Sequence, residues 1–442
     1  MNEEAKIKPK TFFFSIIVAI GLSYFFSAWT TIHLGYIHGA LNAPNGWFYG
    51  SGFPSAVGTF ISSKITNPLS KQIIISRLIF VGIGAICMLF LIFMHQTFLW
   101  WPLNYIGLPI ADGGEGTIDI IKKIIGGRLI KEKVLNPVGK NITTKWLKIQ
   151  NTAYIEMAKA SGLILLNEKD KNPLKTTSFG TGQIIKKTIN KGCRTIYICI
   201  GGSATNDGGI GALTALGIKF YDKNNRLIYP GKGKDLIRIK KINISEIPSE
   251  IFSCKFFILS DVKNTLYGKQ GASYIYGKQK GADDRMIKLL DNGMKNYAKV
   301  LKKTINKDIS NIPGTGAAGG FPTGFLSFFN ADILSGIETI LKIGRFEKKI
   351  KNVDIILTGE GKIDSQIKYG KALSAIFNLS EKYKKHVIAF AGSVEESVYK
   401  NINSPYISMV SILPGIISLE TALKNADKYL SIKVEQMLKN IR

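Results

Sequence analysis

The chain has 442 residues and a formal net charge of +28, which comes mostly from lysine. This length holds two or three domains that can each bury a core, and no basic stripe interleaved with aromatic residues forms a nucleic-acid-binding motif, so we expect no nucleic-acid partner. The 4 cysteines form no CxxC pair and the 4 histidines are scattered, which argues against a disulfide framework, a zinc site or histidine-based catalysis.

The amino-terminal quarter is predicted to be a membrane segment. Two apolar runs, at about 12–30 and 73–95, approach the ~20 residues that a helix needs to cross a bilayer. A cleaved signal peptide is the alternative for the first run, but the run is long for one and no small-x-small cleavage site follows it. Residues 51–62 and 100–107 resemble the tail of oligopeptide-transporter-like permeases. Two helices are too few for a transport path, so we expect a fragment rather than a carrier.

Residues 109–442 have the pattern of an α/β domain, so we place a domain boundary between 1–108 and 109–442. Apolar runs without polar alternation are typical of strands covered on both faces of a parallel sheet. The segment 126–152 instead alternates and turns, which indicates a smaller antiparallel element outside the main sheet. We expect strands at 195–200, 255–259, 353–357, 387–390 and 406–413, and helices at 117–125, 181–190, 283–305, 331–343 and 371–383.

A first glycine-rich loop, ADGGEGT, precedes the first predicted helix at 111–117. Its glycines, including Gly113 and Gly114, let backbone amides approach an anion at the helix N-terminus. Two carboxylates in the same loop suit Mg²⁺ binding or the orientation of a hydroxyl group. We therefore take Asp112 as a catalytic candidate and Glu115 as a metal-binding candidate.

A second loop, GGSATNDGG at 201–209, follows the predicted strand 195–200. In an open parallel sheet, ligands bind in the crevice at the carboxyl ends of the strands. Asp207 is our candidate for the base that accepts the proton of an attacking hydroxyl group, although metal binding also suits it. The amides and hydroxyl groups of the loop can cradle phosphate, and the binding candidates are Gly201, Gly202, Ser203, Thr205 and Asn206.

A third cluster of charge lies in LTGEGKID at 357–364, after the predicted strand 353–357. Glu360 and Asp364 are four residues apart and flank Lys362, so metal and phosphate charge can both be neutralised there. We take Glu360 as a catalytic candidate, Asp364 as a metal-binding candidate and Lys362 as a phosphate-binding candidate.

Two more loops complete the set. Asp261 follows the predicted strand 255–259 and is a third metal-binding candidate. GTGAAGG at 314–320 precedes a helical stretch and offers Gly316 and Gly319 to phosphate. Each loop alone has a plainer interpretation, because glycine and aspartate in a turn usually provide positive φ or an Asx turn.

Several familiar motifs are absent from the sequence. No segment matches GxxxxGK[ST], and the glycine spacings do not place GxGxxG after the first strand of a dinucleotide fold. Ser203 is not in a GxSxG elbow with a partner histidine, which argues against triad hydrolase chemistry.

In combination and in order, the glycine loops and four further segments resemble the glycerate kinase family, which has a two-lobed α/β fold. The match covers about residues 110–442 and is far more specific than any single loop. The segments that carry it are ADGGEGT at 111–117, EMAKASGL at 156–163, TSFGTGQII at 177–185, GGSATNDGGIG at 201–211, SDVKNTLYGKQGA at 260–272, YGKQKGA at 276–282, GTGAAGG at 314–320 and LTGEGKID at 357–364.

The resemblance implies a Rossmann-like parallel-sheet lobe and a second, smaller α/β lobe, with the active site between them. It also implies a kinase that uses ATP and Mg²⁺, takes D-glycerate as acceptor and releases 2-phosphoglycerate. Such an enzyme must align the hydroxyl group with the γ-phosphoryl group and neutralise spreading charge. We expect Ser203, Thr205 and the nearby glycine amides to bind the carboxylate of glycerate.

The chain departs from the family pattern at its front. Family members usually open with an apolar strand and a Pro-Asp-Ser-Phe-Lys-Gly loop, and residues 1–109 contain no equivalent. Loss of a charged group from a catalytic cleft can cost orders of magnitude in rate. The alternative to an active kinase is therefore a membrane-tethered, truncated and inactive binding domain. Two spans put both ends on one side and a kinase needs ATP, so we expect the kinase domain in the cytoplasm, free of the membrane if the front segment is an artefact.

Overall fold

A computed structural model of the chain describes residues 107–111, 113–364 and 372–439. These residues belong to a compact unit that spans Asn104–Arg442. Both predicted membrane spans and Asp112 lie outside the described residues. Within the described part, no helix has both the length and the apolar composition that a membrane span requires.

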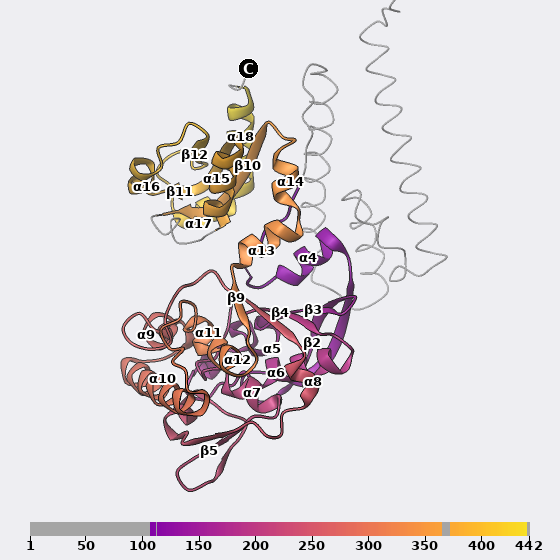
Figure 1. Cartoon of the computed structure of the whole chain (residues 1–442). Helices are drawn as coiled ribbons and strands as arrows, with labels where there is room; N and C mark the ends of the chain where they lie inside the picture. Colours follow the sequence, from indigo (N-terminus) through magenta and orange to yellow (C-terminus); the bar gives the residue numbers. More distant parts are fainter. Residues whose placement is uncertain (1–106, 112, 365–371, 440–442) are drawn as a thin grey trace, which may run out of the picture. The chain divides into compact units, whose positions relative to one another are not determined.

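The largest sheet among the described residues has six strands in the order β1-β2-β3-β4-β8-β9. Figure 1 labels four of them, β2, β3, β4 and β9. β1 pairs with β2 and β2 with β3 in antiparallel fashion, whereas β3, β4, β8 and β9 are parallel. The carboxyl ends of these four parallel strands therefore lie along one edge of the sheet. The bounds of the strands are β1 Arg128–Leu135, β2 Asn141–Ile149, β3 Thr152–Glu156, β4 Thr195–Cys199, β8 Lys255–Leu259 and β9 Asp332–Leu334.

Helices connect most of the strands. The longest helix among the described residues, α10, begins after Asp283, whose carboxylate accepts a hydrogen bond from the N–H of Met286 and so caps the helix. The α-helices are α4 Thr117–Ile125, α5 Ala158–Ser161, α6 Phe179–Asn190, α7 Ile210–Ala215, α8 Ser249–Phe252, α9 Ala272–Tyr276, α10 Asp284–Ile305, α11 Ala317–Gly320, α12 Pro322–Phe328, α13 Gly336–Ile343, α14 Phe346–Ile350, α15 Ala372–Tyr383, α16 Glu396–Asn401, α17 Leu419–Lys424 and α18 Ala426–Lys439. The 3₁₀ helices are η1 Leu163–Leu165, η2 Glu168–Asp170, η3 Gly233–Arg238 and η4 Lys278–Lys280.

Both faces of the six-stranded sheet are covered. Ile155 and Ile198 point to one face and join the main buried cluster with α6, α7, α10 and α12. Tyr154, Tyr197 and Phe257 point to the other face and stack in register, with ring centroids 4.8 and 4.9 Å apart. The helices α4 and α13 pack against this second face. Coverage on both faces explains why the inner strands are continuous apolar runs in the sequence.

Two three-stranded sheets complete the fold. β6 Leu227–Ile228, β5 Lys219–Tyr221 and β7 Lys241–Asn243 form a small antiparallel sheet. β10 Ile355–Ile363, β11 His386–Val394 and β12 Ile407–Ser411 form a parallel sheet. The core of this second parallel sheet is a separate apolar cluster to which α15 contributes. The chain therefore has a mixed α/β fold with parallel sheets, as the sequence predicts.

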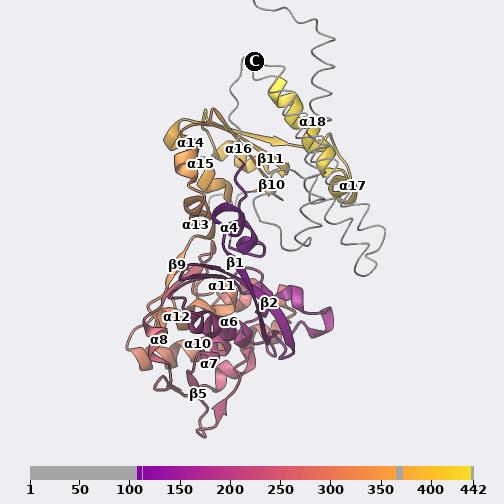
Figure 2. The ribbon, with the colours of Figure 1, turned by 90° about the vertical axis from the view of Figure 1, so that its right-hand side faces the viewer.

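Three local predictions were wrong. The segment 126–152 forms β1 and β2, which are antiparallel but extend the main sheet itself (Figure 2). The predicted helix 331–343 begins later, at Gly336, because the segment before it pairs with β8 as β9. The segment 357–364 is not a loop, since β10 stays paired with β11 as far as Ile363.

Candidate active site

The first and second glycine loops touch at the carboxyl edge of the six-stranded sheet. The N–H of Gly201 donates to the carbonyl oxygen of Gly113 at 3.2 Å. A Cβ added to Gly201 would lie 2.6 Å from the Cα of Gly114, which is closer than any side chain allows. The two backbones can meet here because residue 201 is a glycine and has no side chain.

The glycine loop 314–320 lies against the other side of the second loop. The N–H of Gly208 donates to the carbonyl oxygen of Gly319 at 2.9 Å. Gly319 has a φ of +72°, and a Cβ there would lie 2.1 Å from the carbonyl oxygen of Thr205. Gly316 packs equally closely against the carbonyl oxygen of Thr265, beyond the end of β8. Both predicted phosphate-binding glycines are therefore in contact with neighbouring loops.

Asp261 lies just after β8, at the same edge of the sheet. Its carboxylate accepts hydrogen bonds from the hydroxyl group of Ser335 at 2.6 Å and from the N–H of Ile337 at 3.3 Å. The carboxylate therefore lies at the N-terminus of α13, where negative charge is favourable. The first loop is adjacent, because a Cβ on Gly113 would meet Leu259 at 3.3 Å and Gly336 at 3.5 Å.

Asp207 is enclosed in the protein and does not face an open site. Asp207 is 0% exposed. Its carboxylate accepts hydrogen bonds from the N–H and the hydroxyl group of Ser178, both at 2.7 Å, and from the N–H of Gly209 at 3.1 Å. Burial raises the pKa of Asp207, and these hydrogen bonds together with one from Gly211 act in the opposite direction. The arrangement is that of a residue that holds the loop in shape, so the structure gives no support to Asp207 as the general base.

The polar residues at the centre of the second loop are also buried. The amide of Asn206 donates to Ser273 Oγ at 2.9 Å. Thr205 Oγ1 and Asn206 Oδ1 have no hydrogen-bond partner within the described residues. Ser203, which is 5% exposed, accepts a hydrogen bond from Lys280 Nζ at 3.0 Å, and the same Nζ donates to the carbonyl oxygen of Thr205 at 2.7 Å.

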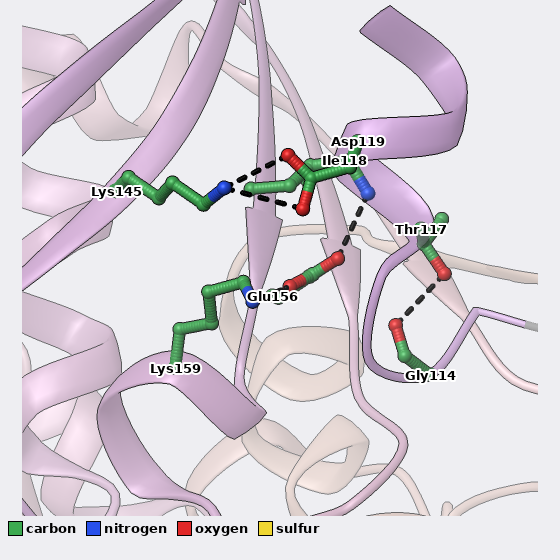
Figure 3. A network of polar contacts seen from close by, with 7 residues as sticks. All are labelled: Gly114, Thr117, Ile118, Asp119, Lys145, Glu156 and Lys159. Carbon is green, nitrogen blue, oxygen red and sulfur yellow. Dashed lines mark hydrogen bonds and ion pairs between the residues drawn. The ribbon is translucent and has the colours of Figure 1, made fainter. Parts of the chain in front are cut away.

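Glu156 is a second buried charge that motif reasoning did not single out. It ends β3, and its carboxylate accepts the N–H of Ile118 at 2.8 Å in the first turn of α4 (Figure 3). Lys159 lies 3.2 Å from the other carboxylate oxygen. Burial raises the pKa of Glu156, and the Ile118 N–H and Lys159 counteract this shift. The α4 N-terminus, which we expected to receive a ligand anion, therefore already has an anion from the chain itself.

The same close-up shows how the first loop joins α4. Thr117 Oγ1 donates to the carbonyl oxygen of Gly114 at 2.8 Å, and Lys145 Nζ pairs with Asp119 at 2.8 Å (Figure 3). The described residues of the loop are thus tied to α4, and the side chain of Glu115 is exposed.

The remaining candidates lie on β10 or directly after it. The two-residue period of a strand puts the side chains of Glu360 and Lys362 on the same face. Asp364 follows the strand directly. Among the described residues no three or more His, Cys, Asp or Glu side chains are grouped to hold a metal ion. The predicted metal-binding residues Asp261, Asp364 and Glu115 therefore do not form a protein-only metal cage in this part of the chain.

Comparison with known proteins agrees with this architecture. The model of the Glycerate kinase family matches residues 94–442, and the Family of unknown function (DUF6785) matches residues 1–128. Glycerate 2-kinase of Escherichia coli (strain K12) is 40% identical over 325 residues, which are 73% of this chain and 85% of that protein. Glycerate kinase of Bacillus cereus (strain ATCC 10987 / NRS 248) is 40% identical over 341 residues, which are 76% and 88% of the two chains.

A solved structure matches as well. The crystal structure of a Salmonella typhimurium LT2 protein assigned as glycerate kinase 2 is 35% identical, has a TM-score of 0.63, and the match covers 78% of this chain and 92% of that one. These similarities define an enzyme of the kinase class, a transferase. The chain belongs to the glycerate kinase family. The permease resemblance expected for the front segment is not confirmed by the match to residues 1–128.

Proposed function

We propose that the chain transfers the γ-phosphoryl group of ATP to a hydroxyl group of D-glycerate and releases 2-phosphoglycerate. The observation that carries the proposal is the contact of glycine loops at one edge of the six-stranded sheet, where Gly201 donates to Gly113 and Gly208 donates to Gly319. Glycine loops at the carboxyl ends of parallel strands let the backbone approach a ligand closely, and this edge of a sheet is where ligands bind. We place this activity in the cytoplasm, because ATP is available there.

The chain must orient two anionic ligands more than it must perform covalent chemistry. Ser203 is suited to the carboxylate of glycerate, whereas the N–H groups of Gly201, Gly208 and Gly209 already donate within the protein. Thr205 Oγ1 and Asn206 Oδ1 are buried oxygen atoms without a partner in the described residues, and such atoms are costly unless a ligand or water satisfies them. Asp207 shapes this loop from inside, so the candidates for proton acceptance are Asp112 and Glu360.

Mg²⁺ fits this donor set as a companion of the nucleotide. Magnesium is usually held by one or two carboxylates together with phosphate oxygens and water, rather than by a protein cage. Asp261 lies at the same edge of the sheet as the second loop and would contribute one carboxylate. When bound, the ion supplies positive charge that neutralises the transferring phosphoryl group.

Analysis of the product tests the proposal. The full chain is incubated with ATP, Mg²⁺ and D-glycerate, and the phosphoester is identified by proton-coupled ³¹P NMR. We expect a doublet, because the phosphate of 2-phosphoglycerate couples to the single proton on C2. A triplet would place the phosphate on C3 and refute the proposed product. Thermal stabilisation by ATP or D-glycerate without any new phosphoester would indicate a binding domain without turnover.

A further inference from the structure

Lys280 is held inside the protein by a tight turn. It ends the 3₁₀ helix η4, is 2% exposed, and its N–H donates to the carbonyl oxygen of Gly277 at 3.0 Å. The next residue, Gly281, has a φ of +90° and lies so close to Lys171 that an added Cβ would be 2.2 Å from its carbonyl oxygen. The backbone at Lys280 therefore has little freedom, and its side chain is directed to a defined place.

The side chain reaches the second glycine loop. Lys280 Nζ donates to Ser203 Oγ at 3.0 Å and to the carbonyl oxygen of Thr205 at 2.7 Å. Both acceptors are uncharged, so the contacts do not fully compensate the loss of hydration of an ammonium group. Burial lowers the pKa of Lys280 to about 7, and the nearby charge of Asp207 acts in the opposite direction. A buried lysine with a shifted pKa beside a glycine loop is a candidate for a functional role.

The direction of the hydrogen bond decides what Ser203 can do. A serine hydroxyl has one proton to donate and two lone pairs to accept with. Since Lys280 donates to Ser203 Oγ, one lone pair is used and the hydroxyl proton remains available to donate to another group. Ser203 lies between Gly202 and Ala204, whose backbones are fixed by hydrogen bonds with Leu163 and Ser161. Because the backbone on both sides of Ser203 is held in place, the hydrogen bond from Lys280 sets the orientation of the Ser203 hydroxyl group.

We propose that Lys280 is a positioning residue that makes Ser203 a hydrogen-bond donor to the carboxylate of a small hydroxy acid. This inference rests on the proposed function, because it assumes that the second loop binds the acceptor substrate. It assigns the specificity for an anionic acceptor to a pair of residues, one from the loop and one from the YGKQKGA segment. A neutral polyol that lacks the carboxylate would gain nothing from this donor.

Binding of D-glycerate to the full chain, measured by calorimetry without ATP, tests the pair. Ser203→Ala removes the donor and Lys280→Met removes the group that orients it, so each should weaken binding about 10- to 100-fold. The double variant should bind D-glycerate with the same affinity as the single variant that binds it less tightly. Both substitutions remove the same interaction, so their effects do not add. Lys278→Met is the matched control, since Lys278 lies in the same segment but its side chain is 74% exposed, and it should bind as the wild type does.

Each outcome decides the inference. Wild-type binding by Ser203→Ala or by a folded Lys280→Met, or losses that multiply in the double variant, would overturn it. If Lys280→Met does not fold, Lys280→Gln, which also removes the ammonium group, replaces it, and wild-type binding by that variant would overturn the inference as well. ATP affinity should change less than twofold in either variant. Absence of phosphoryl transfer by the wild type, with binding of D-glycerate intact, would refute the proposed function but leave the role of Lys280 standing.

Discussion

Gly201 and Gly114 are in backbone contact, although they are far apart in the sequence. The N–H of Gly201 bonds to the residue before Gly114, and a Cβ on Gly201 would approach the Cα of Gly114 to 2.6 Å. One loop follows β4 and the other precedes α4, so this contact brings the ends of two different elements together. The contact places the first and second loops side by side at the carboxyl edge of the six-stranded sheet.

Gly201→Ala should therefore damage catalysis. The added methyl group must push the two loops apart, and a displacement of about 1 Å in a phosphoryl-transfer site can cost on the order of 100-fold in rate. We expect kcat/KM for D-glycerate to fall by about that factor. Gly415→Ala is the control, because a Cβ there meets nothing within 4 Å. Equal kcat/KM values for Gly201→Ala and the wild type would show that the loop contact is irrelevant to activity.

Asp207→Asn separates a structural role from a catalytic one. Asn offers an NH₂ group toward backbone N–H donors that now bond to a carboxylate, so we expect the free energy of unfolding to fall by about 2–4 kcal/mol. Urea denaturation measures this change. A general base would behave differently, because its loss lowers kcat by a large factor while stability stays the same. That second result would restore Asp207 as the base.

Substitutions of Glu156 should distinguish its hydrogen bond from its charge. Glu156→Gln keeps an acceptor for the N–H of Ile118, and burial already raises the pKa of this carboxyl group, so we expect a loss of less than about 1 kcal/mol. Glu156→Leu leaves the N–H of Ile118 and the ammonium of Lys159 without their partner and should cost about 2–3 kcal/mol. Thermal or urea unfolding measures the loss of stability in each variant. Equal losses would show that the hydrogen bond and the charge of Glu156 cannot be separated in this way.

The stability of the protein should depend on pH through Lys280. The pKa of Lys280 is about 7 in the folded protein, whereas the ordinary pKa of an exposed lysine is 10.5. Between these values the unfolded chain therefore binds more protons than the folded chain. Stability therefore rises with pH across this window, by at most about 1.4 kcal/mol per pH unit from this group. Lys280→Met removes this contribution. The free energy of unfolding of Lys280→Met minus that of the wild type should thus be highest below pH 7 and should decline toward pH 10. A difference that stays constant with pH would contradict the lowered pKa of Lys280.

Much of the fold follows from local sequence signals. The helix 117–125 and the strand 255–259 were predicted with the bounds that α4 and β8 have, because an amphipathic period and an uninterrupted apolar run are strong signals. The strand β9 was missed because three residues, Asp332–Leu334, give too short a pattern to distinguish from the start of a helix. The extension of β10 was missed because Gly359 and Gly361 have the composition of a turn, and only pairing with β11 keeps them extended.

The close contacts of the glycine loops follow from the sequence, whereas the positions of the buried charges do not. Glycine pairs identify places of close backbone approach, and Gly201, Gly316 and Gly319 all have such contacts. Nothing in the local pattern shows that Asp207 points inward or that Lys280 reaches Ser203, since both facts depend on how distant segments pack. The family-like segments EMAKASGL and YGKQKGA contain Glu156 and Lys280. Charged residues inside these segments were the signal in the sequence that pointed to both positions.

The rate of ADP formation by the full chain tests the central claim most directly. With ATP and Mg²⁺ present, the wild type should release ADP in a one-to-one ratio with phosphoglycerate only after D-glycerate is added, and Gly201→Ala should do so about 100-fold more slowly at low substrate. ADP release that is independent of D-glycerate, or no release by a folded wild type that still binds both ligands, would contradict the account.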